Sequence, residues 1–168
     1  MDLTSDNTFW PIKNGIPSAF AELTSPIECE VLVLGGGITG ALIADSFSKA
    51  GISTVVVEKR RIAHGSTSAS TALLQYEIDT PLYKLQDMIG VAEARTAYIL
   101  CGDSINYIEK LTQEMSDDCG FRKQPSLYIA SAENDVEWLQ LELEARKQAG
   151  FSVDWRDKDQ VATIYGLE

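Results

Sequence analysis

The clearest pattern along the chain is an apolar run, then glycines, then a helical repeat. Residues 30–34 form an almost continuous apolar stretch, typical of a parallel strand that is covered on both faces. Residues 39–50 place apolar side chains at helical spacing, and Gly51 stands where a helix would end. Residues 52–58 contain three consecutive valines and predict a second strand. The order of strand, helix and strand predicts a βαβ unit.

The second half of the chain is dominated by helical patterns. From Val91 onward apolar residues recur at intervals of three, four and seven, which predicts a helix to about Ser116 with its apolar stripe in the core. Residues 134–149 predict a second, acidic helix that ends at Gly150. A short helix is expected near residues 157–165. The stripe of the first helix consists of Ala94, Tyr98, Cys101, Ile105, Ile108 and Met115.

Three other segments carry weaker signals. Residues 126–130 and 151–155 are rich in β-branched and aromatic side chains and predict two further strands. Residues 1–26 contain three prolines and scattered polar residues, which predicts an irregular arm anchored by Phe9 and Trp10. The hydroxyl-rich segment 65–71 predicts a loop that opens a short helix over residues 72–76.

Charge and length narrow the functional class. The chain has 168 residues, enough for one domain with a buried core, and its 14 basic against 25 acidic residues give a formal net charge of −11. That balance argues against nucleic acid, which is bound through clustered Lys and Arg, and against anionic membrane surfaces. The most apolar run, residues 31–44, is shorter than the roughly 18 residues of a membrane span. No basic leader begins the chain, so a cytoplasmic location is expected.

The cysteines and the histidine suggest no metal site. Cys29, Cys101 and Cys119 are odd in number, widely spaced and form no C-x-x-C pair, so neither a disulfide framework nor a zinc site is expected. His64 is the only histidine. A lone histidine in a loop is more often simply exposed, and no catalytic role is assigned to it.

The glycines between the two predicted strands form the pattern G-x-G-x-x-G, which is weak evidence when it stands alone. Here the pattern follows a predicted strand and opens a predicted helix, and its last glycine, Gly40, precedes Glu58 by 18 residues. This context matches a dinucleotide-binding fingerprint, in which the glycines make a tight turn and admit a pyrophosphate. The helix N-terminus adds unpaired N–H groups that attract phosphate. The candidate phosphate-binding residues are Gly35, Gly36, Gly37, Ile38, Thr39 and Gly40.

Glu58 ends the second predicted strand, where a carboxylate accepts hydrogen bonds from the hydroxyls of an adenosine ribose. A 2′-phosphate would be repelled there, which favours FAD or NAD over NADP. Lys59 is included among the candidate cofactor-binding residues, because a basic group at this place can meet a phosphate. The run that continues with Arg60 and Arg61 is interpreted mainly as a solvated charged surface.

The fingerprint, Glu58 and the hydroxyl-rich segment 65–71 together resemble the FAD-dependent oxidoreductases of the D-amino-acid oxidase and glycine oxidase type. In that family the segment after the second strand lies along the flavin's pyrophosphate and ribityl chain. The resemblance therefore implies FAD as the cofactor. It adds four candidate cofactor-binding residues, of which Ser66 also suits a helix N-cap. They are Ser66, Thr67, Ser70 and Thr71, and each hydroxyl alternatively does no more than cap a helix.

The resemblance implies an α/β fold with a Rossmann-like FAD-binding βαβ core and the start of a second α+β substrate domain. The expected organisation is an N-terminal arm over 1–29, the FAD-binding region over 30–90, and a helical segment with a partial substrate domain over 91–168. Family members are considerably longer. We therefore expect the N-terminal portion of a larger enzyme, inactive by itself, with its catalytic residues elsewhere.

The implied reaction is oxidation of a small amine or amino-acid-like substrate by hydride transfer to FAD. Two alternatives remain. An NAD-binding Rossmann dehydrogenase would require further alternating strands and helices. A non-enzymatic interaction module would use the acidic helices over 91–116 and 134–149 as contact surfaces. Self-association through exposed apolar surface is also expected of a partial chain.

Overall fold

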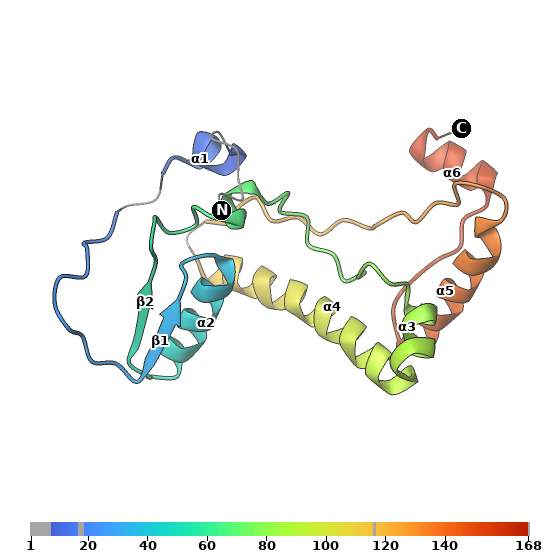
Figure 1. The fold of residues 1–168 in the computed structure, drawn as a ribbon. Helices are drawn as coiled ribbons and strands as arrows, with labels where there is room; N and C mark the ends of the chain where they lie inside the picture. The colour runs from blue at the N-terminus through green and yellow to red at the C-terminus, as the bar shows by residue number, and fades with distance from the viewer. Residues whose placement is uncertain (1–7, 17–18, 116, 168) are drawn as a thin grey trace. The chain divides into compact units, whose positions relative to one another are not determined.

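The computed structural model describes residues 8–16, 19–115 and 117–167 and divides the chain into two compact units, residues 1–73 and 74–168. The first unit holds the predicted strand, helix and strand: β1 (Val31–Leu34), α2 (Ile38–Lys49) and β2 (Thr54–Val57). The two strands pair in parallel, with Val33 opposite Val56 (Figure 1). A parallel pair needs a crossover connection, which α2 provides.

One face of this small sheet is covered by α2. Val33 is buried, and the backbone of α2 approaches it at Gly40. Leu32 and Leu34 alternate to the other face and are 55% and 78% exposed. The prediction of a strand covered on both faces is therefore wrong for the part of the chain that the structure describes, because α2 is the element that packs on the pair and it covers a single face.

The segments around the βαβ unit differ from the predictions. The N-terminal arm contains a short helix, α1 (Phe9–Asn14), where an irregular segment was expected. The hydroxyl-rich segment forms the single 3-10 turn η1 (Ser66–Ala69), and residues 72–76 are not helical. Ala72 has a left-handed φ of 57°, which does not continue a helix. Gly65 is the N-cap of η1, so the prediction that Ser66 is an N-cap is wrong.

The second unit is helical. It contains α3 (Leu82–Ile89), α4 (Val91–Glu114), α5 (Asp135–Ala149) and α6 (Lys158–Tyr165). The sequence analysis did not predict α3, whereas the other three were expected. As predicted, Gly150 ends α5 in a left-handed conformation. Asp157 and Gln160 form a capping box that begins α6.

The core of the second unit lies where α3, α4 and α5 meet. The apolar stripe of α4 enters this core only in its first half, where Ala94 and Tyr98 have no exposed surface. Met115 follows the helix and is 52% exposed, and Ser116 lies outside the described residues. The buried core residues are Leu82, Leu85, Ala94, Tyr98, Ala145 and Ala149.

The two strands predicted in the second unit are absent. Residues 126–130 and 151–155 belong to no strand, and β1 and β2 form the one sheet among the described residues. A strand requires pairing with another strand, and neither segment has such a partner among the described residues. Each helix of the described ranges is too short or too polar to cross a bilayer.

Candidate cofactor-binding site

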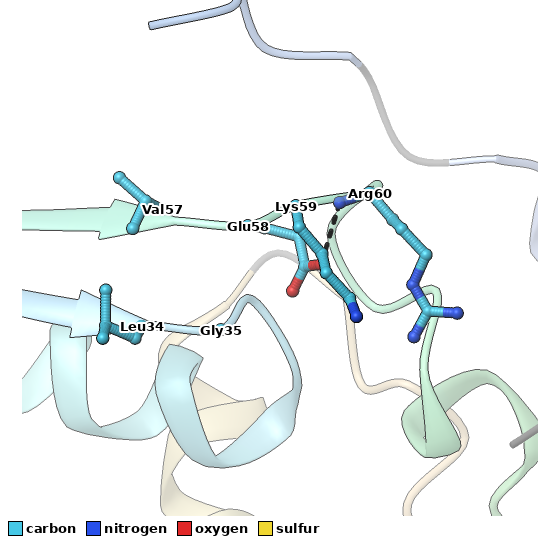
Figure 2. A pocket seen from close by; sticks show the side chains of 6 residues that line it. All are labelled: Leu34, Gly35, Val57, Glu58, Lys59 and Arg60. Carbon is cyan, nitrogen blue, oxygen red and sulfur yellow. Dashed lines mark hydrogen bonds between the residues drawn. The ribbon is translucent and has the colours of Figure 1, made fainter. Parts of the chain in front are cut away.

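The turn between β1 and α2, residues 35–40, is called the glycine turn below. Gly35 has a φ of 111°, which side chains rarely permit. Its N–H donates to the carbonyl oxygen of Val57 at 2.8 Å, so the pairing of the strands continues into the turn. A pocket of about 480 Å³ opens here and is lined by Leu34, Gly35, Val57, Glu58, Lys59 and Arg60 (Figure 2). It lies at the carboxyl ends of the parallel strands, where open α/β sheets bind their ligands.

A Cβ at either of two glycines of the turn would meet neighbouring atoms. A Cβ on Gly40 would lie 2.0 Å from the carbonyl oxygen of Gly35 and 3.3 Å from Cγ1 of Val33. A Cβ on Gly36 would lie 2.4 Å from Cδ1 of Ile62. Because the neighbour of Gly40 is backbone, only glycine permits this close packing of α2 on β1. Such close packing of helix on strand is the role of the third glycine in a dinucleotide-binding fingerprint.

The N-terminus of α2 receives a cap from a distant residue. Gly37 is the N-cap and has no side chain to bond the first amides. Thr67 of η1 fills this role, since its Oγ1 accepts from the Ile38 N–H at 3.0 Å. A hydroxyl that accepts one bond still has its own proton to donate. Thr67 therefore lies at the glycine turn with a donor left for a phosphate oxygen.

Glu58 follows β2 and turns its carboxylate to the glycine turn (Figure 2). Its Oε2 accepts from the Gly36 N–H at 2.9 Å, and its Oε1 accepts from the Arg60 N–H at 3.0 Å. The bond from Gly36, followed by that from Arg60, holds the pKa of Glu58 below its usual value. Each carboxylate oxygen has a second acceptor position, so the ionised group can still bind hydroxyls.

Some of the other candidate residues bond within their own turn, and the rest are exposed side chains. Ser70 Oγ accepts from the Ala72 N–H at 3.1 Å, and Thr71 Oγ1 accepts from the Leu73 N–H at 3.4 Å, so both hydroxyls support their own turn. Ser66 is exposed. Thr39, in the first turn of α2, is exposed too, and Lys59 lines the pocket.

Sequence reasoning did not single out Ser68, which is 5% exposed and donates to the Gly65 carbonyl at 2.9 Å. Its position in a run of small hydroxyl residues carried no signal that separated it from its neighbours. His64 is exposed. No group of three or more His, Cys, Asp or Glu in the described ranges is arranged to hold a metal ion.

The second unit contains a buried charged cluster that sequence reasoning also missed. Arg146 of α5 donates to Glu142 at 2.7 Å, to Glu77 at 3.1 Å and to the hydroxyl of Tyr76 at 3.2 Å. Arg146 and Glu142 are 5% and 2% exposed. Burial lowers the pKa of Arg146, but the bond to Glu142 and the nearby charges outweigh it and raise this pKa above its usual value. These four residues and Tyr98, whose ring lies 6.0 Å from the guanidinium carbon, are called the Arg146 cluster below.

The Arg146 cluster is bonded to the backbone around it, although Nη2 of Arg146 is buried without a hydrogen-bond partner among the described residues. The N–H of Tyr83 donates to Glu142 at 3.0 Å, and the Tyr98 hydroxyl donates to the Thr80 carbonyl at 2.8 Å. Burial raises the pKa of Tyr98, which keeps its hydroxyl protonated. The i, i+4 spacing of Glu142 and Arg146 was the only signal in the sequence, and such pairs usually lie on an exposed helix face.

Comparison with known proteins agrees with a dinucleotide site. The sequence model of the family described as FAD-dependent oxidoreductase (DAO) matches residues 30–167, and the chain belongs to this family. FAD is the cofactor of the family. The match begins one residue before β1 and includes the glycine turn, Glu58 and η1.

Several curated relatives are similar to the chain. The putative Rieske 2Fe-2S iron-sulfur protein YhfW of Bacillus subtilis is 30% identical over 88% of the chain and 29% of its own length. The gamma-glutamylputrescine oxidoreductase of Escherichia coli is 25% identical over 78% of the chain and 30% of its own length. The alpha-glycerophosphate oxidase of Enterococcus casseliflavus is 43% identical over 30% of the chain and 8% of its own length. The chain thus spans less than a third of these relatives. No solved structure matches it.

Proposed function

We propose that the glycine turn binds the pyrophosphate of FAD and that the chain is the FAD-binding portion of an oxidoreductase. The observation that best supports this proposal is the close approach of Gly40 to the Gly35 carbonyl. This packing brings the N-terminus of α2 to the carboxyl ends of the strands. Helix N-termini bind phosphate because their first N–H groups lack partners within the helix. Family membership over residues 30–167 supports FAD over NAD as the ligand.

Each candidate residue receives a separate task in this proposal. The N–H groups of Gly37 and Thr39 face the pyrophosphate, and the Thr67 hydroxyl, which accepts from the Ile38 N–H, donates to one of its oxygens. Glu58 accepts from the ribose hydroxyls, a task that needs the ionised carboxylate and therefore suits its lowered pKa. Lys59 offsets the negative charge of the phosphates at the pocket, in a chain whose net charge is −11. Ser66, Ser70 and Thr71 shape the segment that carries Thr67.

Amide resonance mapping by NMR tests this assignment. Adding FAD to the isotopically labelled chain is expected to shift the resonances of Gly36, Gly37, Ile38 and Thr67 most strongly. The resonances of α6, in the other unit, serve as the internal control. Shifts confined to the second unit, or none at the glycine turn at saturating FAD, would contradict the proposal.

We infer further that the whole protein oxidises a small amine or amino-acid-like compound. Bound FAD supplies the hydride acceptor for such an oxidation. The similarity to a gamma-glutamylputrescine oxidoreductase over 78% of the chain supports the amine class, and the similarity to an alpha-glycerophosphate oxidase covers only 30%. Anaerobic bleaching of the flavin absorbance in the whole protein separates the two classes. Amines should bleach it, whereas bleaching by glycerol phosphate alone would overturn the amine assignment.

A further inference from the structure

Helix α1 is joined to the cofactor-facing segment through Trp10. The indole Nε1 donates to the Ser70 carbonyl at 2.7 Å, although the two residues are 60 positions apart. Trp10 is half-buried. Helix α1 precedes residues 30–167, the range that the family model matches, so family membership assigns it no role.

A short path of hydrogen bonds leads from Trp10 to the glycine turn. The Ser70 N–H donates to the Thr67 carbonyl at 3.3 Å, and Thr67 Oγ1 accepts from the Ile38 N–H at 3.0 Å. Between these bonds lies η1, a 3-10 turn of four residues. Such a turn has poor hydrogen-bond geometry and little stability by itself. External bonds must therefore fix the place of Thr67.

Trp10 is itself held in one orientation. The Phe9 ring packs edge-to-face on it with centroids 5.0 Å apart, and the Lys13 ammonium lies 5.5 Å from the Trp10 ring centroid. A helix of six residues does not form alone in water, so α1 depends on contacts such as the bond to Ser70. Ile12 is 71% exposed and offers a control position on the same helix.

We propose that Trp10 is a positioning residue of the dinucleotide site. Its indole N–H fixes the end of η1, which holds the Thr67 hydroxyl at the N-terminus of α2 before the cofactor arrives. The cofactor then need not order this segment, and affinity rises by the ordering free energy that is saved. This inference rests on the proposed binding of FAD at the glycine turn. Loss of one such bond is expected to weaken binding by about fivefold.

The substitution Trp10→Phe tests the proposal, because it removes the N–H and keeps an aromatic ring. FAD affinity is measured by flavin fluorescence, and amide exchange of Ile38 and residues 66–71 is measured without FAD. We expect an affinity loss of about fivefold together with faster exchange at Ile38. Two control variants should change neither quantity. Ile12→Leu alters an exposed position of the same helix, and Trp138→Phe removes a tryptophan from the other unit.

A double-mutant cycle separates positioning from general stability. If Trp10 acts through Thr67, then Trp10→Phe should change FAD affinity less than about twofold in a Thr67→Val background. An equal loss in both backgrounds overturns the proposed path, and wild-type affinity in Trp10→Phe overturns the positioning role altogether. If the unmodified chain binds no FAD, the proposed function is what fails. Exchange at Ile38, which needs no ligand, still reports whether Trp10 holds η1.

Discussion

The glycine turn and the Arg146 cluster use their polar groups in opposite ways. At the glycine turn, a pocket opens at the ends of the strands, and the bonded carboxylate of Glu58 that lines it keeps acceptor positions free. In the Arg146 cluster, Glu142 and Arg146 are 2% and 5% exposed and are bonded to each other. The first arrangement leaves acceptors at an open pocket. The second uses Nε and Nη1 of Arg146 to join α5 to the segment that holds Tyr76 and Glu77, and leaves Nη2 without a hydrogen-bond partner in the described part of the chain.

The difference separates a network of charged side chains that mainly supports the fold from a turn at the edge of an open pocket. A buried ion pair is costly to desolvate and stabilises the fold only when its geometry is good, so most of its hydrogen bonds are made within the protein. A helix N-terminus needs no buried side-chain charge to bind an anion. Each prediction below alters one side of this contrast.

The largest effect is expected for Arg146→Met. Its removal leaves the buried carboxylate of Glu142 and the neighbouring Glu77 without their cation, a change that costs about 3–5 kcal/mol of unfolding free energy. Urea unfolding, followed by the emission of Trp138 and Trp155, measures the loss in the second unit. Lys147→Met is the matched control, because Lys147 pairs on the surface with Glu144 and its loss should cost under about 1 kcal/mol. Equal effects of the two variants would refute a structural role for the cluster.

A smaller effect is expected for Gly40→Ala. The added Cβ meets the backbone oxygen of Gly35, so α2 must move away from β1 at a cost of about 1–3 kcal/mol, and FAD affinity should fall tenfold or more. Gly102→Ala is the control. Gly102 lies in α4, and a Cβ there would meet only the Phe151 ring, at 3.8 Å. That variant should keep FAD affinity and gain slight stability from better helix propensity. Unchanged affinity in Gly40→Ala would refute the packing argument.

Thr67→Val should lower the unfolding free energy of the first unit by about 1 kcal/mol, because the Ile38 N–H loses its cap. The emission of Trp10 in a Trp138→Phe, Trp155→Phe background reports unfolding of this unit. Thr67→Ser keeps the hydroxyl and should retain most of the stability. A serine variant as unstable as the valine variant would show that the methyl group of Thr67, and not its hydroxyl, supports α2.

The smallest effect concerns pH and Glu58. Its bonds from Gly36 and Arg60 lower its pKa below 4.5 in the folded chain. A carboxyl with a lowered folded pKa stabilises the fold above its unfolded pKa, and the contribution disappears as pH falls through the folded value. The difference in unfolding free energy between wild type and Glu58→Gln should therefore keep the same size from about pH 7 to 5. It should shrink as the pH falls below about 4.5. A difference that persists unchanged to about pH 3 would contradict the lowered pKa.

The sequence predicted well what depends on neighbours along the chain. Strand β1, helix α2 and strand β2 follow from apolar runs and from glycines at fixed spacing, and Gly150 marks the end of α5. The predictions failed where distant partners decide. Residues 126–130 have the composition of a strand, but a strand forms only beside another backbone.

The same limit applied to the candidate site. The pattern identified the glycine turn and Glu58 but not that Thr67 caps a helix 29 positions earlier in the chain. It gave no hint that Trp10 bonds to Ser70, because hydrogen bonds between distant segments leave no periodic trace. The Arg146 cluster joins Glu77 to α5 across 69 positions, and it was missed for the same reason.

The most direct test of the central claim is a titration of the chain with FAD, followed by flavin fluorescence, with NAD and FMN as competitors. The account predicts saturable binding of FAD that neither competitor displaces at equal concentration, and binding that Gly40→Ala weakens at least tenfold. Binding of NAD in preference to FAD would contradict the account and favour a nicotinamide-dependent dehydrogenase. FAD binding that is unaffected by Gly40→Ala would contradict the assignment of the site to the glycine turn.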